Sequence, residues 1–340
     1  MKCVAFSKEV WWNEGNMKGE AQGMGRWVSK YGHGLVAAVL ITLVTGYALL
    51  DVFVIPHEYA GVANAAGKQR EAGSTSAGTG AETEAESGQN TPSEPVITDR
   101  SYQDADISIT ITEYRVSDTN VYVADVRVSS PEYLFSALAG NKYGRNIKDS
   151  TSAIAKQAGA ILAVNGDFYG ARNRGYVIRN GVLYREAGSK ENEDLVLYAD
   201  GTMKVVNEAD VSAKTLLNDG AAQVWAFGPG LISDGEITIS ARQEVGRAMA
   251  SNPRTAIAFV DEGHYLFVVS DGRTSENDGL TLYELAQFLQ SLGAETAYNL
   301  DGGGSSTMVF MGEVINNPTT NGRNTSERSV SDIVCIGYQN

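Results

Sequence analysis

The chain has 340 residues and a formal net charge of −14 at pH 7, a length that suits one large or two small globular domains. This charge argues against a general nucleic-acid binder, which would carry a basic face, but a local group of arginines could still hold an anionic small substrate. The two cysteines, Cys3 and Cys335, lie at opposite ends of the chain, so neither a disulfide framework nor a cysteine metal site is expected.

An apolar run at residues 35–55 follows a basic N-terminal stretch and contains one charged residue, Asp51. About 20 apolar residues suffice to cross a bilayer. The cations lie before this run, so the positive-inside rule predicts a cytoplasmic tail at residues 1–34 and an extracytoplasmic C-terminal part. We therefore expect a single-pass signal anchor in the cell membrane. Ala63-Asn64-Ala65 keeps a cleaved signal peptide open as the alternative.

Residues 56–98 are rich in Gly, Ser, Thr, Ala and Glu, above all between positions 67 and 95. Such a composition cannot bury enough apolar surface to offset the entropy of the chain, so we predict a disordered linker. The globular part is then expected to span residues 99–340, as one domain.

Short β-branched and aromatic runs recur through residues 99–340 and end at Gly, Asn or Asp, as strands do. The predicted strands are 107–114, 120–128, 161–169, 194–200, 202–206, 222–232, 255–261, 265–270, 296–300, 307–311 and 332–338.

Helical patterns are fewer. Residues 282–292 have apolar side chains on one face, with Thr281 and Glu284 as a capping box. Shorter helices are predicted at 152–158 and 210–217. The fold class is therefore α/β (mixed α+β): a single globular domain with mixed β-sheets and a few helices, preceded by one transmembrane helix.

A pattern G-A-x-x-A-x-N-x-D occurs at residues 159–167 and again at 293–301, each time after a predicted helix. In each copy the Asn and Asp lie two positions apart, so their side chains leave the same face of a strand. Ligands of α/β sheets bind at the carboxyl ends of strands. This pseudo-repeat predicts two polar pairs at one site, Asn165 with Asp167 and Asn299 with Asp301. Two unrelated Asx-turns are the simpler alternative.

Three glycines and three hydroxyl residues follow Asp301 in the stretch NLDGGGSST. A glycine-rich turn exposes successive backbone N–H groups that can bind an anion, which predicts a phosphate cradle at Gly303, Gly304, Ser305 and Ser306. Arginines match phosphate oxygens with a planar fork. The candidates in loops beside strands are Arg254, Arg273 and Arg328.

Four carboxylates lie near the predicted strand ends: Asp167, Asp271, Asp301 and Glu327. Cleavage of a sugar bond usually needs two carboxyl groups, and oxygen-rich loops also suit calcium or magnesium. Both uses remain open, so a divalent cation is a candidate cofactor.

The stretches NGDFY, GPGLISDG, RTAIAF, SDGR, GLTLYELAQFLQSLGAETAYNLDGGGSSTMVF and NNP…ERSVSDIV stand in this order between residues 150 and 340. Together they resemble the phosphodiester glycosidases. The resemblance implies hydrolysis of a sugar-1-phosphodiester, with the four carboxylates as acid–base and binding groups. It also implies that the three arginines and the Gly303–Ser306 backbone bind phosphate.

Our interpretation is a membrane-anchored extracytoplasmic hydrolase that acts on sugar-1-phosphodiesters of an envelope polymer or exopolysaccharide, with Asp167 and Asp301 as the first candidates for acid–base chemistry. Its expected partners are a phosphorylated glycan and, through residues 35–55, the membrane, but no nucleic acid. One alternative is a non-catalytic module that binds glycan or a partner protein. Another is a phosphodiesterase that cuts the P–O bond.

Overall fold

The structure is a computed structural model that describes residues 14–60, 63–64, 94–243 and 251–339. It divides into two units, Met1–Ile55 and Pro56–Asn340. Most of the predicted linker and part of the predicted cytoplasmic tail fall outside the described residues. The described ends of the linker carry the short strands β1 (His57–Glu58), β2 (Ala63–Asn64) and β3 (Val96–Ile97).

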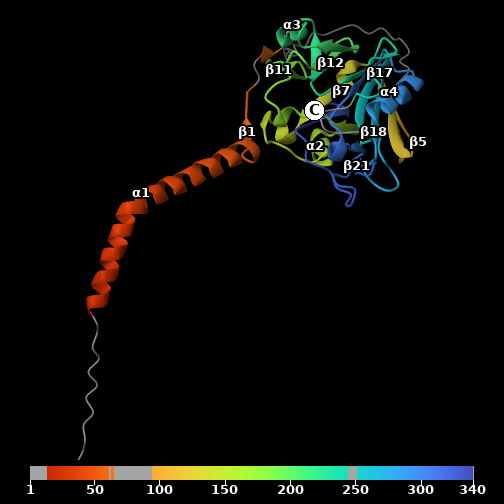
Figure 1. The fold of residues 1–340 in the computed structure, drawn as a ribbon. Coiled ribbons are helices and arrows are strands. Elements are labelled where there is room, and N and C mark those ends of the chain that lie inside the picture. The colour runs from red at the N-terminus through yellow and green to blue at the C-terminus, as the bar shows by residue number, and fades with distance from the viewer. Residues whose placement is uncertain (1–13, 61–62, 65–93, 244–250, 340) are drawn as a thin grey trace, which may run out of the picture. The chain divides into compact units, whose positions relative to one another are not determined.

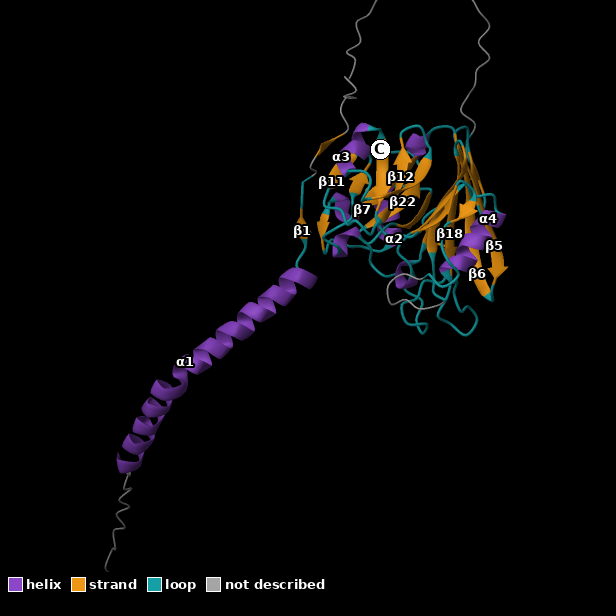
Figure 2. Ribbon diagram, turned by 45° about the horizontal axis from the view of Figure 1, so that its top comes forward, coloured by secondary structure: helices purple, strands orange, loops and turns teal. Residues whose placement is uncertain are grey.

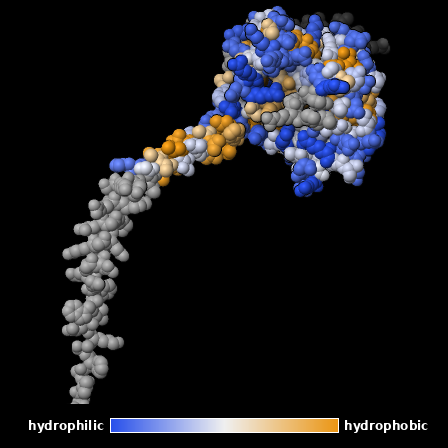
Figure 3. Space-filling model, in the orientation of Figure 1, coloured by the Kyte–Doolittle hydropathy of each residue, from blue (hydrophilic) through white to orange (hydrophobic). Residues whose placement is uncertain are grey.

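The N-terminal unit is one helix, α1 (Glu14–Phe53), which extends well upstream of the predicted apolar segment. Within it, Val36–Phe53 is long and apolar enough to cross a membrane. Within the N-terminal unit the apolar side chains of this stretch are exposed, and its surface carries mostly orange tones in Figure 3. Helices that are apolar on all sides occur in the cores of large proteins and as membrane spans.

The second unit is built mainly of strands, with short helices between them (Figures 1 and 2). Its largest sheet has nine strands, and strands from the start of the unit lie beside strands from its second half. In spatial order they are β16 (Glu236–Ile237), β15 (Gly230–Ser233), β19 (Thr296–Asn299), β17 (Thr255–Asp261), β18 (His264–Ser270), β6 (Thr119–Val128), β5 (Ile107–Val116), β4 (Ser101–Gln103) and β3.

Two further sheets complete the layers. The five-stranded sheet has the order β21 (Glu313–Val314), β20 (Met308–Phe310), β9 (Leu162–Asn165), β22 (Asp332–Ile336) and β7 (Leu134–Leu138). The six-stranded sheet has the order β13 (Met203–Asn207), β12 (Glu193–Tyr198), β14 (Ala221–Trp225), β10 (Val177–Arg179), β11 (Val182–Arg185) and β2. A short pair joins β1 to β8 (Gly144–Arg145). All the pairings among the described strands are antiparallel.

Each large sheet packs one helix against its outer face, while the inner faces share a core. The helices are α2 (Thr151–Ala158) on the five-stranded sheet, α3 (Ala213–Asn218) on the six-stranded sheet and α4 (Leu282–Ser291) on the nine-stranded sheet. The shared core takes side chains from all three sheets, among them Leu162, Trp225 and Tyr298. The predicted mixture of sheets and few helices in a single domain is confirmed.

The ends of the helices follow the sequence signals. Thr281 caps α4 and forms the predicted capping box with Glu284. The apolar face of α4 is buried, and each leucine on it contributes about 1.5–3 kcal/mol relative to exposure. Gly159 ends α2 with φ 65°, a left-handed conformation that glycine adopts without strain.

The two copies of the repeated pattern occupy equivalent places. Each helix, α2 or α4, covers the strand that follows it, β9 or β19, and each strand is inside its own sheet. The two strands meet at their carboxyl ends. Asn165 Nδ2 donates to the carbonyl of Asp301 at 2.6 Å, and the Asp301 N–H donates to the carbonyl of Gly166 at 3.3 Å. The pseudo-repeat therefore joins two sheets at the carboxyl ends of β9 and β19.

Short 3₁₀ turns shape the connections around this junction. They are η1 (Pro131–Tyr133), η2 (Ala139–Asn141), η3 (Tyr169–Ala171) and η4 (Gly303–Ser305). Two of them, η3 and η4, directly follow the strand ends that carry Asp167 and Asp301.

Candidate active site

Asp301 lies at the centre of a polar cluster where β19 ends. Its Oδ2 accepts hydrogen bonds from Ser305 Oγ at 2.6 Å and from Arg328 Nη2 at 3.0 Å. Arg328 also donates to Ser305 Oγ at 2.8 Å and to the carbonyl of Gly302 at 3.0 Å. The side chain of Arg328 is 39% exposed and that of Asp301 only 10%. The arrangement therefore presents an arginine to solvent above a nearly buried carboxylate.

Burial raises the pKa of Asp301 above its ordinary value, although the Arg328 charge and the hydrogen bonds from Ser305 and Arg328 oppose the shift. Arg172 opposes it more weakly from the loop that follows β9. A carboxyl group with a raised pKa can exchange a proton closer to neutral pH, which is the property that general acid–base chemistry needs.

A second arginine, Arg273, lies beside the glycine turn, next to Gly303. Its Nη2 would be 2.7 Å from a Cβ atom placed on Gly303, so only glycine leaves room for the guanidinium. Its Nη1 donates to the carbonyl of Thr320 at 2.7 Å. Burial lowers the pKa of Arg273, and the charge of Arg328 lowers it further. Two like charges close enough to repel each other would be stabilised by an anion between them.

The glycine turn forms η4, and most of its amides are used inside the chain. The N–H of Gly303 donates to the carbonyl of Pro253 at 2.8 Å. Those of Ser305 and Ser306 donate to the carbonyls of Gly302 and Gly303 at 3.3 and 3.2 Å. Gly304 lies against Thr320, whose Oγ1 would be 2.2 Å from a Cβ atom on Gly304. These geometries favour binding of an anion by the arginine side chains over binding by this backbone.

Asp167, the partner of Asp301 in the repeat, points into the interior. Its Oδ2 accepts from Arg179 Nη2 at 2.8 Å and from the Ala226 N–H at 2.9 Å. Arg179 also donates from Nε to Asp332 Oδ2 at 2.8 Å. The three side chains are almost completely inaccessible to solvent. The repeat therefore brings the two aspartates to one junction, but it does not bring both carboxylates to the surface there.

The buried triad Asp167–Arg179–Asp332 has two carboxylates of different character. Burial raises the pKa of Asp167, but the charge of Arg179 and the hydrogen bonds outweigh this effect, so the net shift is downward. Burial raises the pKa of Asp332 to about 7, against the charge of Arg179. Asp332 Oδ1 and Oδ2 would be 2.4 and 2.8 Å from a Cβ atom on Gly166, so the triad supports the strand end beneath Asp301.

The two asparagines of the repeat act as connectors between chain segments. Asn165 is buried, and its Oδ1 accepts from Thr255 Oγ1 at 2.8 Å and from the Thr307 N–H at 3.2 Å. Asn299 Nδ2 donates to the carbonyl of Gly228 at 2.8 Å. Both side chains hold loops around the junction in place.

Asp271 and Arg254 are also buried. Asp271 Oδ1 accepts from the Asn317 N–H at 2.8 Å, and its Oδ2 accepts from Asn317 Nδ2 at 3.1 Å. Arg254 Nε donates to the carbonyl of Leu280 at 2.8 Å. Asp271 thus fixes the loop after β20 and β21, and Arg254 fixes the segment that leads into α4.

Glu327 binds the first turn of α2. Its Oε2 accepts from the Ser152 N–H at 2.9 Å, and its Oε1 accepts from Ser152 Oγ at 2.5 Å. A carboxylate at a helix N-terminus satisfies an N–H group that has no partner within the helix and interacts favourably with the helix dipole.

We expect Glu327→Gln to lower the free energy of unfolding by about 0.5–1 kcal/mol, because the charge at the N-terminus of α2 is lost while one oxygen remains as an acceptor. The sugar-1-phosphodiester hydrolysis that the sequence predicts is expected to stay within about threefold of the wild-type rate, because loss of a catalytic carboxylate would lower the rate about 100-fold or more. Urea unfolding and initial rates measure the two effects. A large rate loss in a stably folded variant would return Glu327 to the catalytic residues.

Among the described residues, no three His, Cys, Asp or Glu side chains gather in a group that could hold a metal ion. Sequence reasoning also missed Arg179 and Asp332. Asp332 lies within the quoted motif SVSDIV, and Arg179 closes the strand YVIR, so their positions at strand ends were the available signal.

Residues 158–337, just over half of the chain, match the phosphodiester glycosidase family. The chain is 32% identical over 203 residues to the SPbeta prophage-derived uncharacterized protein YomE of Bacillus subtilis, covering 58% of this chain and 31% of that protein. It is 29% identical over 230 residues to the mouse N-acetylglucosamine-1-phosphodiester alpha-N-acetylglucosaminidase, covering 62% of this chain and 44% of the enzyme. The chain thus spans less than half the length of these relatives.

The structure resembles the catalytic domain of the zebrafish N-acetylglucosamine-1-phosphodiester alpha-N-acetylglucosaminidase, which was solved auto-inhibited by its pro-peptide. The TM-score is 0.55 at 23% identity, over 68% of this chain and 83% of that domain. The likeness supports a common fold. The match over residues 158–337 shows that this chain belongs to the phosphodiester glycosidase family.

Proposed function

We propose that this chain hydrolyses sugar-1-phosphodiesters, releasing a free sugar and a phosphomonoester. The observation that carries the proposal is the cluster of Asp301, Ser305 and Arg328, with Arg273 beside the same glycine turn. It combines an anion site with a carboxyl group whose pKa is raised. The relatives named for cleavage of N-acetylglucosamine-1-phosphodiesters make a sugar of that class the first substrate to test.

In this proposal the two guanidinium groups of Arg273 and Arg328 bind the phosphate oxygens. The bond between the anomeric carbon and its oxygen breaks, and the bonding electrons go to the phosphate, whose added charge the arginines neutralise. A phosphomonoester has a second pKa near 6, so it can leave without first gaining a proton.

In this proposal Asp301 is the general base that accepts a proton from the attacking water. Both of its hydrogen bonds end on Oδ2, and the proposal assigns Oδ1 to the water. Water adds to the anomeric carbon, and its proton passes to the carboxylate and then to solvent. Burial raises the pKa of Asp301, so this base has a pKa nearer to neutral pH than an ordinary aspartate. A higher pKa favours transfer of a proton from water. The buried Asp167 then has a supporting role.

We further propose that α1 anchors the chain in a cell membrane as a single-pass segment, with the catalytic unit on the extracytoplasmic side. The support is the exposed apolar stretch Val36–Phe53 and the basic residues that precede it. A substrate in an envelope polymer or exopolysaccharide would fit this location.

The test uses the full chain in detergent with an aryl sugar-1-phosphate in oxygen-18 water. Cleavage at the anomeric carbon is expected to place the label in the sugar, whereas P–O cleavage places it in the phosphate. Mass spectrometry of both products separates these outcomes. A panel of such esters that bind but yield no product would instead support a non-catalytic glycan-binding module.

A further inference from the structure

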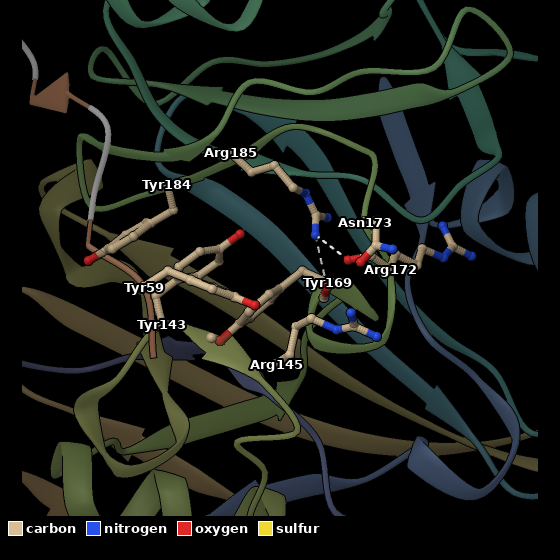
Figure 4. Close-up of a pocket in the computed structure, with 9 residues that line it drawn as sticks. Tyr59, Tyr143, Arg145, Tyr169, Arg172, Asn173, Tyr184 and Arg185 are labelled. Carbon is tan, nitrogen blue, oxygen red and sulfur yellow. Dashed lines mark hydrogen bonds between the residues drawn. The ribbon is translucent and has the colours of Figure 1, made fainter. Parts of the chain in front are cut away.

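Two adjoining cavities open beside the loop that follows β9. The first has a volume of about 250 Å³ and the second about 520 Å³, and both are lined by Arg172 and Asn173. Tyrosines and arginines form most of the wall of the first cavity (Figure 4). We call the pair the arginine–tyrosine pocket, defined by Tyr143, Arg145, Arg172, Arg174, Tyr184 and Arg185.

The pocket has a strong positive charge in an acidic protein. Arg145, Arg172 and Arg185 line the first cavity, and Arg174 lines the second together with Arg172. The lining residues of both cavities include no aspartate or glutamate, although the whole chain carries a net charge of −14. Arg172, Arg174 and Arg185 lie around the cavities with no carboxylate in the lining, and an anionic ligand would stabilise such a group of like charges.

Two of these arginines are held in place before any ligand arrives. Arg185 donates from Nε to the carbonyl of Gly175 at 2.6 Å and from Nη1 to the carbonyls of Tyr169 and Arg172 at 3.0 and 2.6 Å. Its buried Nη2 has no hydrogen-bond partner. Arg172 lies 4.9 Å from the centre of the Phe227 ring. Fixed side chains lose little entropy when they bind a ligand, which favours recognition.

The opposite side of the first cavity is aromatic, with the tyrosines gathered across from Arg145 and Arg185 in Figure 4. The ring of Tyr143 stacks on Tyr169 and Tyr184, with centroids 5.1 and 4.7 Å apart. Tyr59 adds a ring that is 46% exposed. Flat apolar rings with a hydroxyl at one end pack well against molecules that have both apolar faces and polar edges, as sugar rings have.

One short loop connects this pocket to the candidate active site. Gly166, at its start, accepts a hydrogen bond from the N–H of Asp301, and Arg172 and Arg174 lie further along it. The charge of Arg172 acts on the pKa of Asp301. The pocket and the candidate active site therefore share the loop that follows β9.

We propose that the arginine–tyrosine pocket binds a neighbouring sugar unit, with its negatively charged group, of an extended anionic glycan. This inference rests on the proposed function and narrows its substrate class from any sugar-1-phosphodiester to a charged polymer. The arginines bind the anionic group and the tyrosine rings contact the sugar.

The experiment measures binding of short dextran sulfate to the full chain in detergent by isothermal titration calorimetry, with neutral dextran and inorganic tripolyphosphate as comparison probes. None of these probes contains a sugar-1-phosphodiester, so binding is measured independently of turnover. The variants are Arg174→Gln, whose side chain makes one hydrogen bond to the Gly188 carbonyl at 3.3 Å, and Tyr184→Ala. The control is Arg127→Gln, a 60% exposed side chain on β6.

We expect dextran sulfate to bind more tightly than either comparison probe. Arg174→Gln should weaken the binding of dextran sulfate about tenfold, as loss of a charged hydrogen bond does. Tyr184→Ala should weaken dextran sulfate but not tripolyphosphate, and the control should change neither. The proposal would be overturned if Arg127→Gln lost as much affinity for dextran sulfate as the pocket variants. It would also be overturned if tripolyphosphate bound as tightly as dextran sulfate.

The outcome is separable from that of the catalytic proposal. If dextran sulfate binds as expected but no sugar-1-phosphate ester is hydrolysed, the pocket stands and the proposed reaction fails. If small esters are hydrolysed but the pocket variants and the control bind dextran sulfate with the same affinity, the proposed reaction stands and the proposed polymeric substrate fails.

Discussion

Asp301→Asn is expected to abolish sugar release from an aryl sugar-1-phosphate, with a loss in kcat of at least about 100-fold. Asparagine retains an oxygen that can accept from Ser305 and Arg328, so the local geometry should persist. It cannot accept a proton from water at neutral pH. Initial rates at saturating substrate measure the effect, and wild-type rates would remove Asp301 from the mechanism.

The stability of Asp301→Asn provides a second test that does not depend on activity. Burial raises the pKa of Asp301 in the folded state, so the folded protein binds this proton more tightly than the unfolded chain. The contribution of Asp301 to stability is then lost as the pH rises through the interval between the unfolded and folded pKa values. At a pH where Asp301 is ionised in both the folded and the unfolded state, an uncharged asparagine should therefore be at least as stable as the ionised aspartate.

Equilibrium urea unfolding of wild type and Asp301→Asn at pH 8 gives this comparison. An inactive variant with unchanged or greater stability fits a residue whose charge serves catalysis at some cost to the fold. A variant that loses both activity and several kcal/mol of stability would instead assign Asp301 a structural role. Ser305→Ala is the matched control, because it removes a hydrogen bond to the same oxygen without removing the carboxylate.

Helix ends were predicted well from the sequence, because their signals come from neighbouring residues. The capping box at Thr281 and Glu284 and the glycine at position 159 mark helix ends in the structure as they do in the sequence. The repeated pattern predicted that its two copies lie close together, and a 2.6 Å hydrogen bond joins Asn165 of one copy to the carbonyl of Asp301 in the other. These signals depend on residues close in sequence or on an internal comparison.

The direction of individual side chains could not be predicted in the same way. Asp167 and Asp301 occupy equal positions in the repeat, yet one pairs with Arg179 in the interior and the other with Arg328 near solvent. The difference depends on partners 12 and 27 residues away in the chain. Glu327 likewise binds Ser152, 175 residues away. Pairing over such distances is fixed by tertiary packing, which a pattern of neighbouring residues does not report.

The second large effect is expected on the free energy of unfolding, when the buried triad Asp167–Arg179–Asp332 loses its arginine. Arg179→Met should lower the free energy of unfolding by about 3–5 kcal/mol at pH 8, because Asp167 and Asp332 then remain buried without a counterion. Methionine fills much of the same volume, so the loss reports charge more than packing. Arg127→Met is the control: its ion pair with Asp125 is long, at 3.9 Å, and exposed, so a change below about 1 kcal/mol is expected.

The pH dependence separates the loss of charge from a packing defect. In the wild type the charge of Arg179 holds the pKa of Asp167 below its ordinary value despite burial. Without Arg179, burial alone should raise the pKa of both carboxyl groups, so the folded variant takes up protons as the pH falls. The stability difference from wild type should therefore shrink between pH 8 and pH 5. Adding Asp332→Asn to Arg179→Met should recover part of the loss at pH 8. A deficit that is the same at both pH values, with no recovery in the double variant, would show that the triad stabilises this junction by packing and not by its charges.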